Sequence, residues 1–198
     1  MREIGTAFVA GVMAMWISFS AQAAGGGTAP PAHQWSYSGL FGTFDRAQLR
    51  RGFEVYKGVC VACHGLRLVA YRNLQDIGFS ENEVKAIAAE IEVPAEPNDD
   101  GEIEYRPGLP SDRFKSPFPN ENAARAANNG ALPPDLSLIV KARAGGADYI
   151  YALMTGYKDA PEILKVPEGM SFNEYFAGKM IAMVAPLADD GIEYSDGT

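Results

Sequence analysis

Two cysteines and a histidine stand within five consecutive positions of this 198-residue chain, as Cys60, Cys63 and His64. The chain has no other cysteine and only one other histidine, His33. Two thiols three positions apart can add to the two vinyl groups of one haem, and the residue that follows then lies beneath the iron. A histidine in that place is a proximal axial ligand. The motif therefore predicts one haem c, bound covalently through Cys60 and Cys63 and ligated by His64.

Three other uses of a C-x-x-C pair fit this sequence less well. A thioredoxin-like redox pair belongs in a βαβ context, whereas the surrounding pattern here is helical. A structural zinc site needs about four ligands, and outside the motif only His33 remains as a soft donor. A disulfide between the two cysteines suits an exported protein but leaves His64 without a role. Haem attachment is the interpretation that uses all three residues.

The residues alone leave the ligand on the other side of the iron open. An axial methionine would raise the reduction potential relative to a second histidine. Three of the seven methionines lie in the first 15 residues. Met154 has the spacing of a core residue, and Met170 precedes a polar stretch. Met180 and Met183 lie together in an apolar loop, and the residues alone do not choose between them. His33, in the Gly/Pro-rich lead-in, is a further possibility.

Helices are expected on both sides of the motif. One begins after Asp45, carries Leu49, Phe53 and Tyr56 on one face, and ends at Gly58 just before the cysteines. Another begins after Ser80, where Glu83 completes a capping box, and stops at Pro94.

Three further helices are expected: after Asn120, from Pro133-Pro134-Asp135 to Gly145, and from Asp148 to Thr155. Residues 94–119 hold six prolines and no sustained period, which predicts a long loop. No segment alternates as a strand does. The fold class expected is all-α with long loops.

Residues 1–23 have the pattern of a signal peptide. Arg2 gives a positive start, an uncharged apolar core follows, and Ala21-Gln22-Ala23 matches the cleavage site. An uncleaved membrane anchor is the alternative, and both place the rest of the protein outside the cytoplasm. We expect residues 24–44 to form a flexible lead-in and residues 45–198 to form one haem domain.

Acidic residues outnumber basic ones by 25 to 17, for a formal net charge of −8. This balance counts against a protein that coats nucleic acid and suits a basic partner. Seven acids and no base stand between positions 90 and 104. A solvated loop and an electrostatic docking patch both explain such a run. Its members are Glu90, Glu92, Glu96, Asp99, Asp100, Glu102 and Glu104.

Beyond these patterns, the sequence resembles the cytochrome c1 family, the haem c subunits of the cytochrome bc1 complex (ubiquinol–cytochrome c reductase). The likeness covers nearly all of the chain after the leader. It is carried by RRGFEVYK at 50–57, AARAANNGALPPDLSL at 123–138, DY at 148–149 leading to LMTGY at 153–157, and EYSDGT at 193–198. It implies a class I cytochrome c-like haem domain in which Cys60 and Cys63 form the thioethers and His64 is the proximal ligand.

The resemblance also implies the remaining site residues. The family's Ile-x-Met-x-Pro-Pro segment falls on Ile181 to Met183, which chooses Met183 over Met180, although Ala185 stands where the first proline is usual. Haem contacts are implied at four further positions. Arg143 would pair with a propionate, and the pocket lining would include Asn128, Pro134 and Tyr149.

The function implied is one-electron transfer, from a Rieske iron–sulfur subunit through the haem to a basic soluble or membrane-bound cytochrome c. Such a subunit makes no bonds of its own and works beside cytochrome b, on the periplasmic side of a bacterial inner membrane or the equivalent intermembrane-space side in mitochondria. The alternatives are a free periplasmic c-type cytochrome carrier and a haem enzyme or sensor with an open sixth position.

In this family the chain continues past the point where this one stops. It adds a helix that packs across the first haem-domain helix and then a C-terminal membrane anchor. The resemblance therefore implies a C-terminally truncated chain that lacks both. It also leads us to expect that Leu49, Phe53 and Tyr56 form an uncovered apolar patch.

Overall fold

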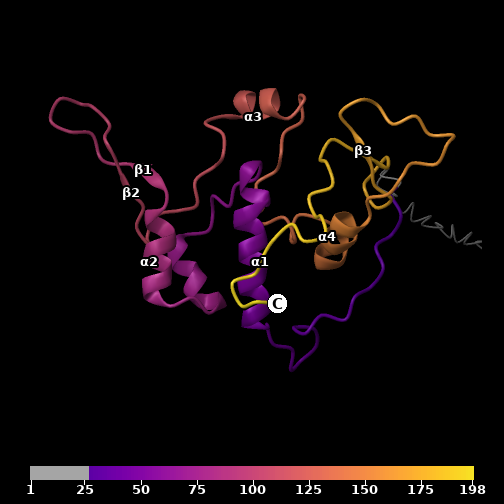
Figure 1. The fold of residues 1–198 in the computed structure, drawn as a ribbon, viewed down its shortest axis with the longest axis horizontal. Coiled ribbons are helices and arrows are strands. Elements are labelled where there is room, and N and C mark those ends of the chain that lie inside the picture. Colours follow the sequence, from indigo (N-terminus) through magenta and orange to yellow (C-terminus); the bar gives the residue numbers. More distant parts are fainter. Residues whose placement is uncertain (1–26) are drawn as a thin grey trace, which may run out of the picture.

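The computed structural model describes residues 27–198, so the predicted signal peptide lies outside the described residues. The fold is mostly helical with little sheet. Helix α1 (Arg46–Gly58) stands at its centre, α2 (Glu81–Ala89) lies on one side of it, and α4 (Gly146–Thr155) lies on the other (Figure 1). Among the described residues, no helix is long and apolar enough to cross a membrane.

Helix α1 begins where the sequence predicts. The carboxylate of Asp45 accepts hydrogen bonds from the backbone N–H groups of Ala47 and Gln48, at 2.9 and 3.2 Å. These bonds satisfy two of the donors that a helix leaves free at its start. The helix runs to Gly58, and the C-x-x-C-H motif follows directly in a short 3₁₀ turn, η1 (Cys60–Ala62).

The inward face of α1 is covered, so the expectation of an uncovered patch is wrong for its two aromatic residues. Phe53 and Tyr56 are only 9% and 8% exposed. Phe79 meets Phe53 edge-on, with ring centroids 5.3 Å apart, and Phe114 meets Tyr56 at 6.0 Å. Both covering rings come from loops. A 3₁₀ helix that the sequence did not reveal, η2 (Tyr71–Ile77), and α2 complete this core.

An ion pair joins helix α2 to α1. Ser80 and Glu83 form the predicted capping box, with the Ser80 N–H 2.7 Å from a Glu83 carboxylate oxygen and the Glu83 N–H 3.3 Å from the Ser80 hydroxyl. The same carboxylate pairs with Arg50 of α1 at 2.6 Å. The Arg50 guanidinium also lies over the Phe79 ring, 4.1 Å from its centroid, a cation–π contact that fixes its orientation.

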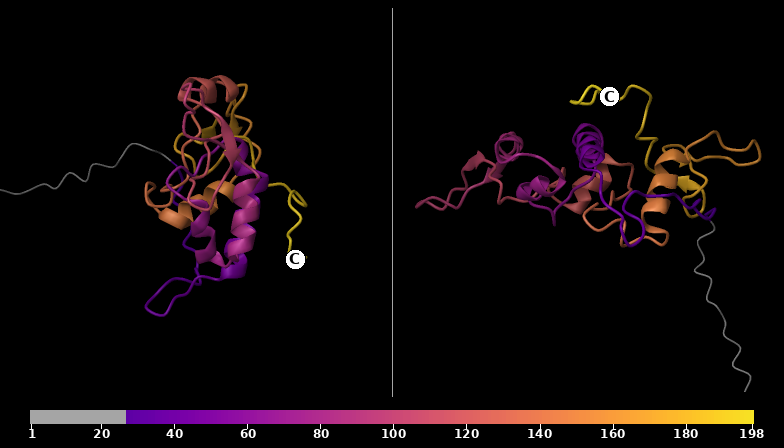
Figure 2. Two further views of the ribbon diagram at one scale, coloured as in Figure 1. Left: turned by 90° about the vertical axis from the view of Figure 1, so that its left-hand side faces the viewer. Right: turned by 90° about the horizontal axis from the view of Figure 1, so that it is seen from below.

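Two short antiparallel hairpins interrupt the otherwise helical fold. Strand β1 (Glu92–Pro94) pairs with β2 (Tyr105–Pro107), and β3 (Ser171–Phe172) pairs with β4 (Met180–Ile181). The first hairpin carries most of the acidic run. From below, this hairpin and the loop after α4 lie at opposite ends of the molecule (Figure 2). The expected all-α class is thus confirmed only as mostly helical.

Of the three later helices, two form as predicted. Helix α3 (Glu121–Ala127) is capped by Asn120, whose side-chain oxygen accepts from the Ala123 N–H at 2.9 Å. Helix α4 ends at Thr155 before Gly156. The helix predicted from Asp135 to Gly145 is wrong, because residues 135–145 form a series of turns. The start of this segment is bonded to the cysteine–histidine motif.

The described part of the lead-in, residues 27–44, runs alongside α4 before it turns towards α1 (Figure 1). Asp148, in the first turn of α4, accepts hydrogen bonds from the Trp35 indole N–H at 2.6 Å and from the His33 backbone N–H at 3.3 Å. The His33 ring stacks on Tyr151, with centroids 5.0 Å apart. These contacts attach the lead-in to α4.

The last residues of the chain lie along α1 (Figure 1). Asp196 pairs with Arg51 at 2.9 Å, and the Ser195 N–H donates to the Glu54 carboxylate at 3.0 Å. Residues 192–198 therefore meet the side of the helix that precedes the motif.

The ion pair between α1 and α2 gives a pH-dependent contribution to stability. The Arg50 hydrogen bond, assisted by Ser80, lowers the pKa of Glu83 from 4.5 to about 2. A depressed native-state pKa stabilises the fold above the unfolded-state value, and this contribution is lost as pH falls through the native value. Glu83→Gln should therefore lower the free energy of unfolding near neutral pH, and its difference from wild type should fade between pH 4.5 and about 2. Urea denaturation at several pH values measures this, with the exposed Glu168→Gln as control. A difference that is constant with pH would contradict the assignment.

Candidate haem-attachment site

The C-x-x-C-H motif is a direct continuation of α1. The Val59 N–H still donates to the Val55 carbonyl at 2.9 Å, in helical register. The carbonyl of Cys60 then accepts from the N–H groups of both Cys63 and His64, at 3.1 and 2.8 Å. This tight turn brings the two cysteines and the histidine together at the end of the helix.

Both cysteines are free and half-buried. Burial, and secondarily the neighbouring Cys63, raises the pKa of the Cys60 thiol. Redox-active C-x-x-C pairs do the opposite, since they lower the pKa of the attacking cysteine to keep it as a thiolate. The local environment of Cys60 therefore argues against a thioredoxin-like pair.

The imidazole of His64 is oriented by a backbone carbonyl. Its Nδ1 lies 2.7 Å from the carbonyl oxygen of Pro134. A carbonyl only accepts hydrogen bonds, so Nδ1 carries the proton in the neutral ring and Nε2 presents a lone pair. Metal-bound histidines are commonly held in this way, with one nitrogen donating to a carbonyl and the other on the metal.

The segment that supplies this carbonyl is bonded to the chain just after the motif. The Leu136 N–H donates to the Gly65 carbonyl at 2.8 Å, the Arg67 N–H donates to the Asp135 carboxylate at 2.9 Å, and the Leu68 N–H donates to the Ser137 hydroxyl at 3.1 Å. Gly65 is buried beneath this contact, and a Cβ there would lie 3.1 Å from the Asp135 carboxylate. Any side chain there would be closer to the carboxylate than an ordinary contact, so the Asp135 side chain would have to shift.

Asp135 is the charged group of this contact. Partial burial acts to raise its pKa, but the hydrogen bonds from Ser137 and Arg67 outweigh burial and hold the pKa below its ordinary value. The carboxylate therefore remains ionised at neutral pH. As an ion it is a stronger acceptor for the two backbone N–H groups than a neutral oxygen would be.

The two candidate methionines have different surroundings. Met180 is part of β4, where it pairs with Phe172. Met183 follows the strand and is half-buried, and the Tyr157 hydroxyl donates to its backbone carbonyl at 3.1 Å. Burial raises the pKa of Tyr157 to about 12, which keeps this phenol protonated as a donor. Of the other methionines considered, Met154 is half-buried in α4, and Met170 is exposed.

The other predicted residues are distributed over three segments. Asn128 caps the end of α3 through its side-chain amide, 2.7 Å from the Ala124 carbonyl. Tyr149 is half-buried in α4, while Arg143 is exposed and its guanidinium reaches the Ala142 carbonyl at 3.2 Å. Within residues 27–198, the hydrogen bonds of these three do not involve the motif, whereas Pro134 contacts His64 directly. The ring of His33 packs on Trp35 and Tyr151.

Asn173 is a residue that the sequence gave no reason to single out. It is fully buried, and its side-chain amide donates to the Leu153 carbonyl at 2.7 Å. Its side-chain oxygen accepts from the N–H groups of Tyr175 and Phe176, at 3.1 and 3.3 Å. A lone asparagine between aromatic residues carries no periodic or motif signal, so only the folded chain reveals this role.

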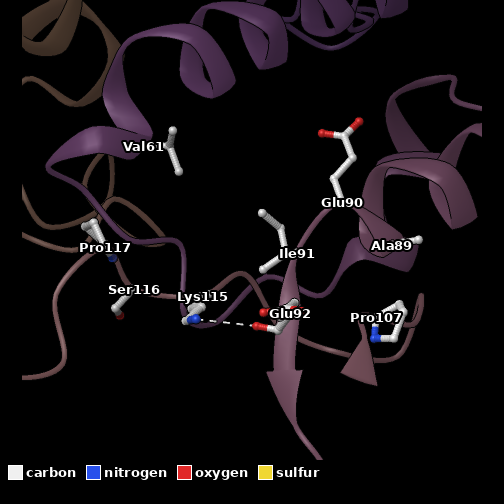
Figure 3. A pocket seen from close by; sticks show the side chains of 9 residues that line it. All are labelled: Val61, Ala89, Glu90, Ile91, Glu92, Pro107, Lys115, Ser116 and Pro117. Carbon is white, nitrogen blue, oxygen red and sulfur yellow. Dashed lines mark hydrogen bonds between the residues drawn. The ribbon is translucent and has the colours of Figure 1, made fainter. Parts of the chain in front are cut away.

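The acidic run lies on a hairpin arm whose base is near the motif and whose tip points away from α1 (Figure 1). Glu90 is paired with Lys57 of α1 at 2.6 Å, whereas the remaining six acids are exposed on the hairpin. An open hollow lies between the hairpin base and the motif, and Val61, the residue after Cys60, lines it together with Ile91 and Lys115 (Figure 3). The Lys115 ammonium donates to the Glu92 carbonyl at 3.4 Å across this hollow (Figure 3).

The donor groups on this chain suit a haem. Two free thiols beside an imidazole with an available Nε2 are the donors that covalent attachment of a haem with a proximal histidine requires. Within residues 27–198 there is no group of three or more His, Cys, Asp or Glu side chains that could hold a bare metal ion.

Comparison with known proteins matches residues 35–198 to the Cytochrome C1 family. The chain is 49% identical to cytochrome c1 of Rhodospirillum rubrum, over 97% of this chain and 76% of the relative. It is also 49% identical to the mitochondrial heme protein cytochrome c1-2 of Solanum tuberosum, over 96% of this chain and 73% of the relative.

A third relative is the mitochondrial cytochrome b-c1 complex catalytic subunit of Candida albicans, which is 53% identical over 87% of this chain. The match covers 60% of that relative. The chain thus spans between 60% and 76% of the length of these three curated proteins.

Removing the Asp135 carboxylate should loosen the contact that orients His64. Asp135→Ala deletes an ionised acceptor of two backbone hydrogen bonds, and we expect a loss of about 2 kcal/mol in the free energy of unfolding. The amide protons of Arg67 and Ser137 should also exchange faster with solvent. Urea denaturation and hydrogen exchange measure the two effects, and the exposed Asp159→Ala should cost less than about 0.5 kcal/mol. Equal losses in the two variants would show that the contact does not hold the segment.

Proposed function

Because the chain belongs to the cytochrome c1 family, we propose that it is the haem-carrying electron-transfer subunit of a cytochrome bc1 complex. The observation that supports this most directly is the state of the motif. Two free thiols stand beside a histidine whose Nδ1 donates to the Pro134 carbonyl, so that Nε2 is left to bind iron.

In this proposal Cys60 and Cys63 hold one haem c through thioether bonds, and His64 and Met183 are its axial ligands. When bound, the haem supplies an iron centre that gains and loses one electron. Met183 is preferred to Met180 because Met180 lies within the paired strand β4, whereas Met183 follows it with its carbonyl held by Tyr157. The chain's own task is to orient these ligands and keep water away from them.

We assign the remaining predicted residues to the surroundings of the haem. Pro134 orients the proximal histidine, and Asn128 and Tyr149 contribute to the pocket lining. The Arg143 guanidinium is exposed and bonded only to its neighbour's carbonyl, which leaves it able to pair with a propionate. An arginine suits that role because its planar fork binds a carboxylate at two points.

The partners follow from the same assignment. The electron arrives from a Rieske iron–sulfur subunit and leaves to a basic cytochrome c, while cytochrome b completes the complex. The domain arrangement is a signal peptide at 1–23, a lead-in at 24–44 and a class I cytochrome c-like haem domain at 45–198. The haem domain then lies on the periplasmic side of a bacterial inner membrane, or the equivalent side in mitochondria, because thioether attachment takes place outside the cytoplasm.

The acidic arm is proposed as the docking surface for the basic cytochrome c. Its exposed carboxylates stand on a two-stranded hairpin whose base borders the motif. A field of one sign near the site of electron exit raises the rate of encounter more than it raises affinity. The hairpin is closed by backbone bonds and by Asn98, whose side chain accepts from the N–H groups of Asp100 and Glu102 at 3.1 and 2.9 Å. The arm therefore has a defined shape.

The ligand assignment is tested by paired methionine variants of the full chain, expressed in a cell that attaches haem. Wild type should show a low-spin spectrum with histidine and methionine ligands. Met183→Leu should lose this spectrum and gain ready carbon monoxide binding, since one axial position is then open. Met180→Leu, the matched control, should retain the wild-type spectrum. If both variants keep it, Met183 is not the ligand, and a wild type that already binds carbon monoxide readily would contradict the proposed function.

The docking proposal is tested by neutralising the tip of the arm. The triple variant Asp99→Asn, Asp100→Asn, Glu102→Gln should slow electron transfer to a basic cytochrome c about tenfold at low salt. The difference should shrink at high salt, since exposed charges are screened over about 10 Å at 0.1 M. The control neutralises three exposed acids on the loop after α4, at the opposite end of the molecule: Asp159, Glu162 and Glu168. Stopped-flow kinetics that respond equally to both triples would exclude the arm as a specific docking surface.

A further inference from the structure

We propose that Tyr157 is a positioning residue for the axial methionine, acting through the backbone of Met183. This inference rests on the proposed ligation by Met183. The Tyr157 hydroxyl donates a hydrogen bond to the Met183 carbonyl at 3.1 Å. Fixing that carbonyl fixes the peptide on which the thioether side chain is mounted.

The bond matters because the ligand segment has little else to hold it. Within residues 27–198, the hydrogen bond from Tyr157 is the only one that involves residues 182–187. The preceding strand β4 pairs with β3 only as far as Ile181. Beyond that residue, the path of the backbone depends on packing and on this single hydroxyl.

Tyr157 is itself held by a rigid frame. It forms a backbone bridge with Asn173, and the buried Asn173 side chain links the Leu153 carbonyl of α4 to the N–H groups of Tyr175 and Phe176. The Asn173 N–H also donates to the Lys179 carbonyl at 2.9 Å, across the β3–β4 hairpin. These bonds join the end of α4 to the hairpin, and the Tyr157 hydroxyl extends from this frame to the Met183 carbonyl.

Gly156 explains why the frame can be so close-packed. A Cβ at this position would lie 2.5 Å from the Tyr175 ring and 2.6 Å from the Ala152 carbonyl oxygen. Its absence lets the Tyr175 ring pack directly against the turn that carries Tyr157. An ion pair between Lys158 and Glu174 joins the same two segments on the surface.

The test compares two Tyr→Phe variants of the haem-loaded full chain. Tyr157→Phe keeps the buried ring and removes only the hydroxyl. Tyr175→Phe is the matched control, since its ring packs on Gly156 while its hydroxyl makes no hydrogen bond within residues 27–198. Imidazole is titrated into the ferric protein, and displacement of methionine is followed by loss of the methionine-to-iron charge-transfer band. Tyr157→Phe should bind imidazole about fivefold more tightly than wild type, as loss of one neutral hydrogen bond predicts.

The control should bind imidazole as wild type does, and both variants should keep the haem attached. Thermal unfolding of the two variants provides the second measurement. If Tyr157→Phe lowers the unfolding temperature but leaves imidazole affinity unchanged, its role is merely structural and the inference is overturned. If Met183→Leu retains the charge-transfer band, the ligand assignment fails and this inference falls with it. If Met183→Leu loses the band but Tyr157→Phe binds imidazole as tightly as wild type does, only the positioning role of Tyr157 is overturned.

Discussion

The contact between the His64 imidazole and the Pro134 carbonyl, 2.7 Å long, is the interaction on which the rest of the site depends. It joins residues 70 positions apart in the sequence, so the ring's orientation depends on where a distant segment lies. That requirement explains the bonds around it. Asp135 and Ser137 accept from the chain after the motif, and the absence of a side chain on Gly65 lets the two segments meet.

The aromatic core around α1 also holds the motif that follows this helix. Phe53 and Tyr56 are buried against Phe79 and Phe114, and the Tyr56 hydroxyl donates to the His64 carbonyl at 3.2 Å. Burial raises the pKa of Tyr56 to about 12, so the hydroxyl remains a donor. One residue therefore belongs both to the core and to the site. A change that loosens the rings around α1 would also displace the backbone of the histidine.

Local signals predicted the elements that local hydrogen bonds determine. The starts of α1, α2 and α3 were predicted because Asp45, Ser80 and Asn120 cap the helices that follow them. The helix expected from Pro133 to Gly145 does not form. Instead, the Leu136 N–H and the side chains of Asp135 and Ser137 bond to the chain after His64, contacts that no local pattern announces. The strands were missed because two or three residues are too few to show alternation. The cover over α1 was missed because it comes from loop residues without a pattern.

The motif side and the methionine side of the proposed site also differ in how far the sequence could predict them. The motif lies in one continuous stretch, so its residues were identifiable from spacing, and its frame is fixed by several bonds including an ionised acceptor. The methionine side brings together α4, a short hairpin and the segment after it, and spacing alone did not separate Met180 from Met183. Beyond the β3–β4 hairpin, the segment that carries Met183 is held by the hydrogen bond from the Tyr157 hydroxyl. A neutral hydrogen bond contributes only about 1 kcal/mol. In the proposed ligation by Met183, the methionine side is therefore the one expected to be displaced more easily, and its geometry depends on residues that no motif reveals.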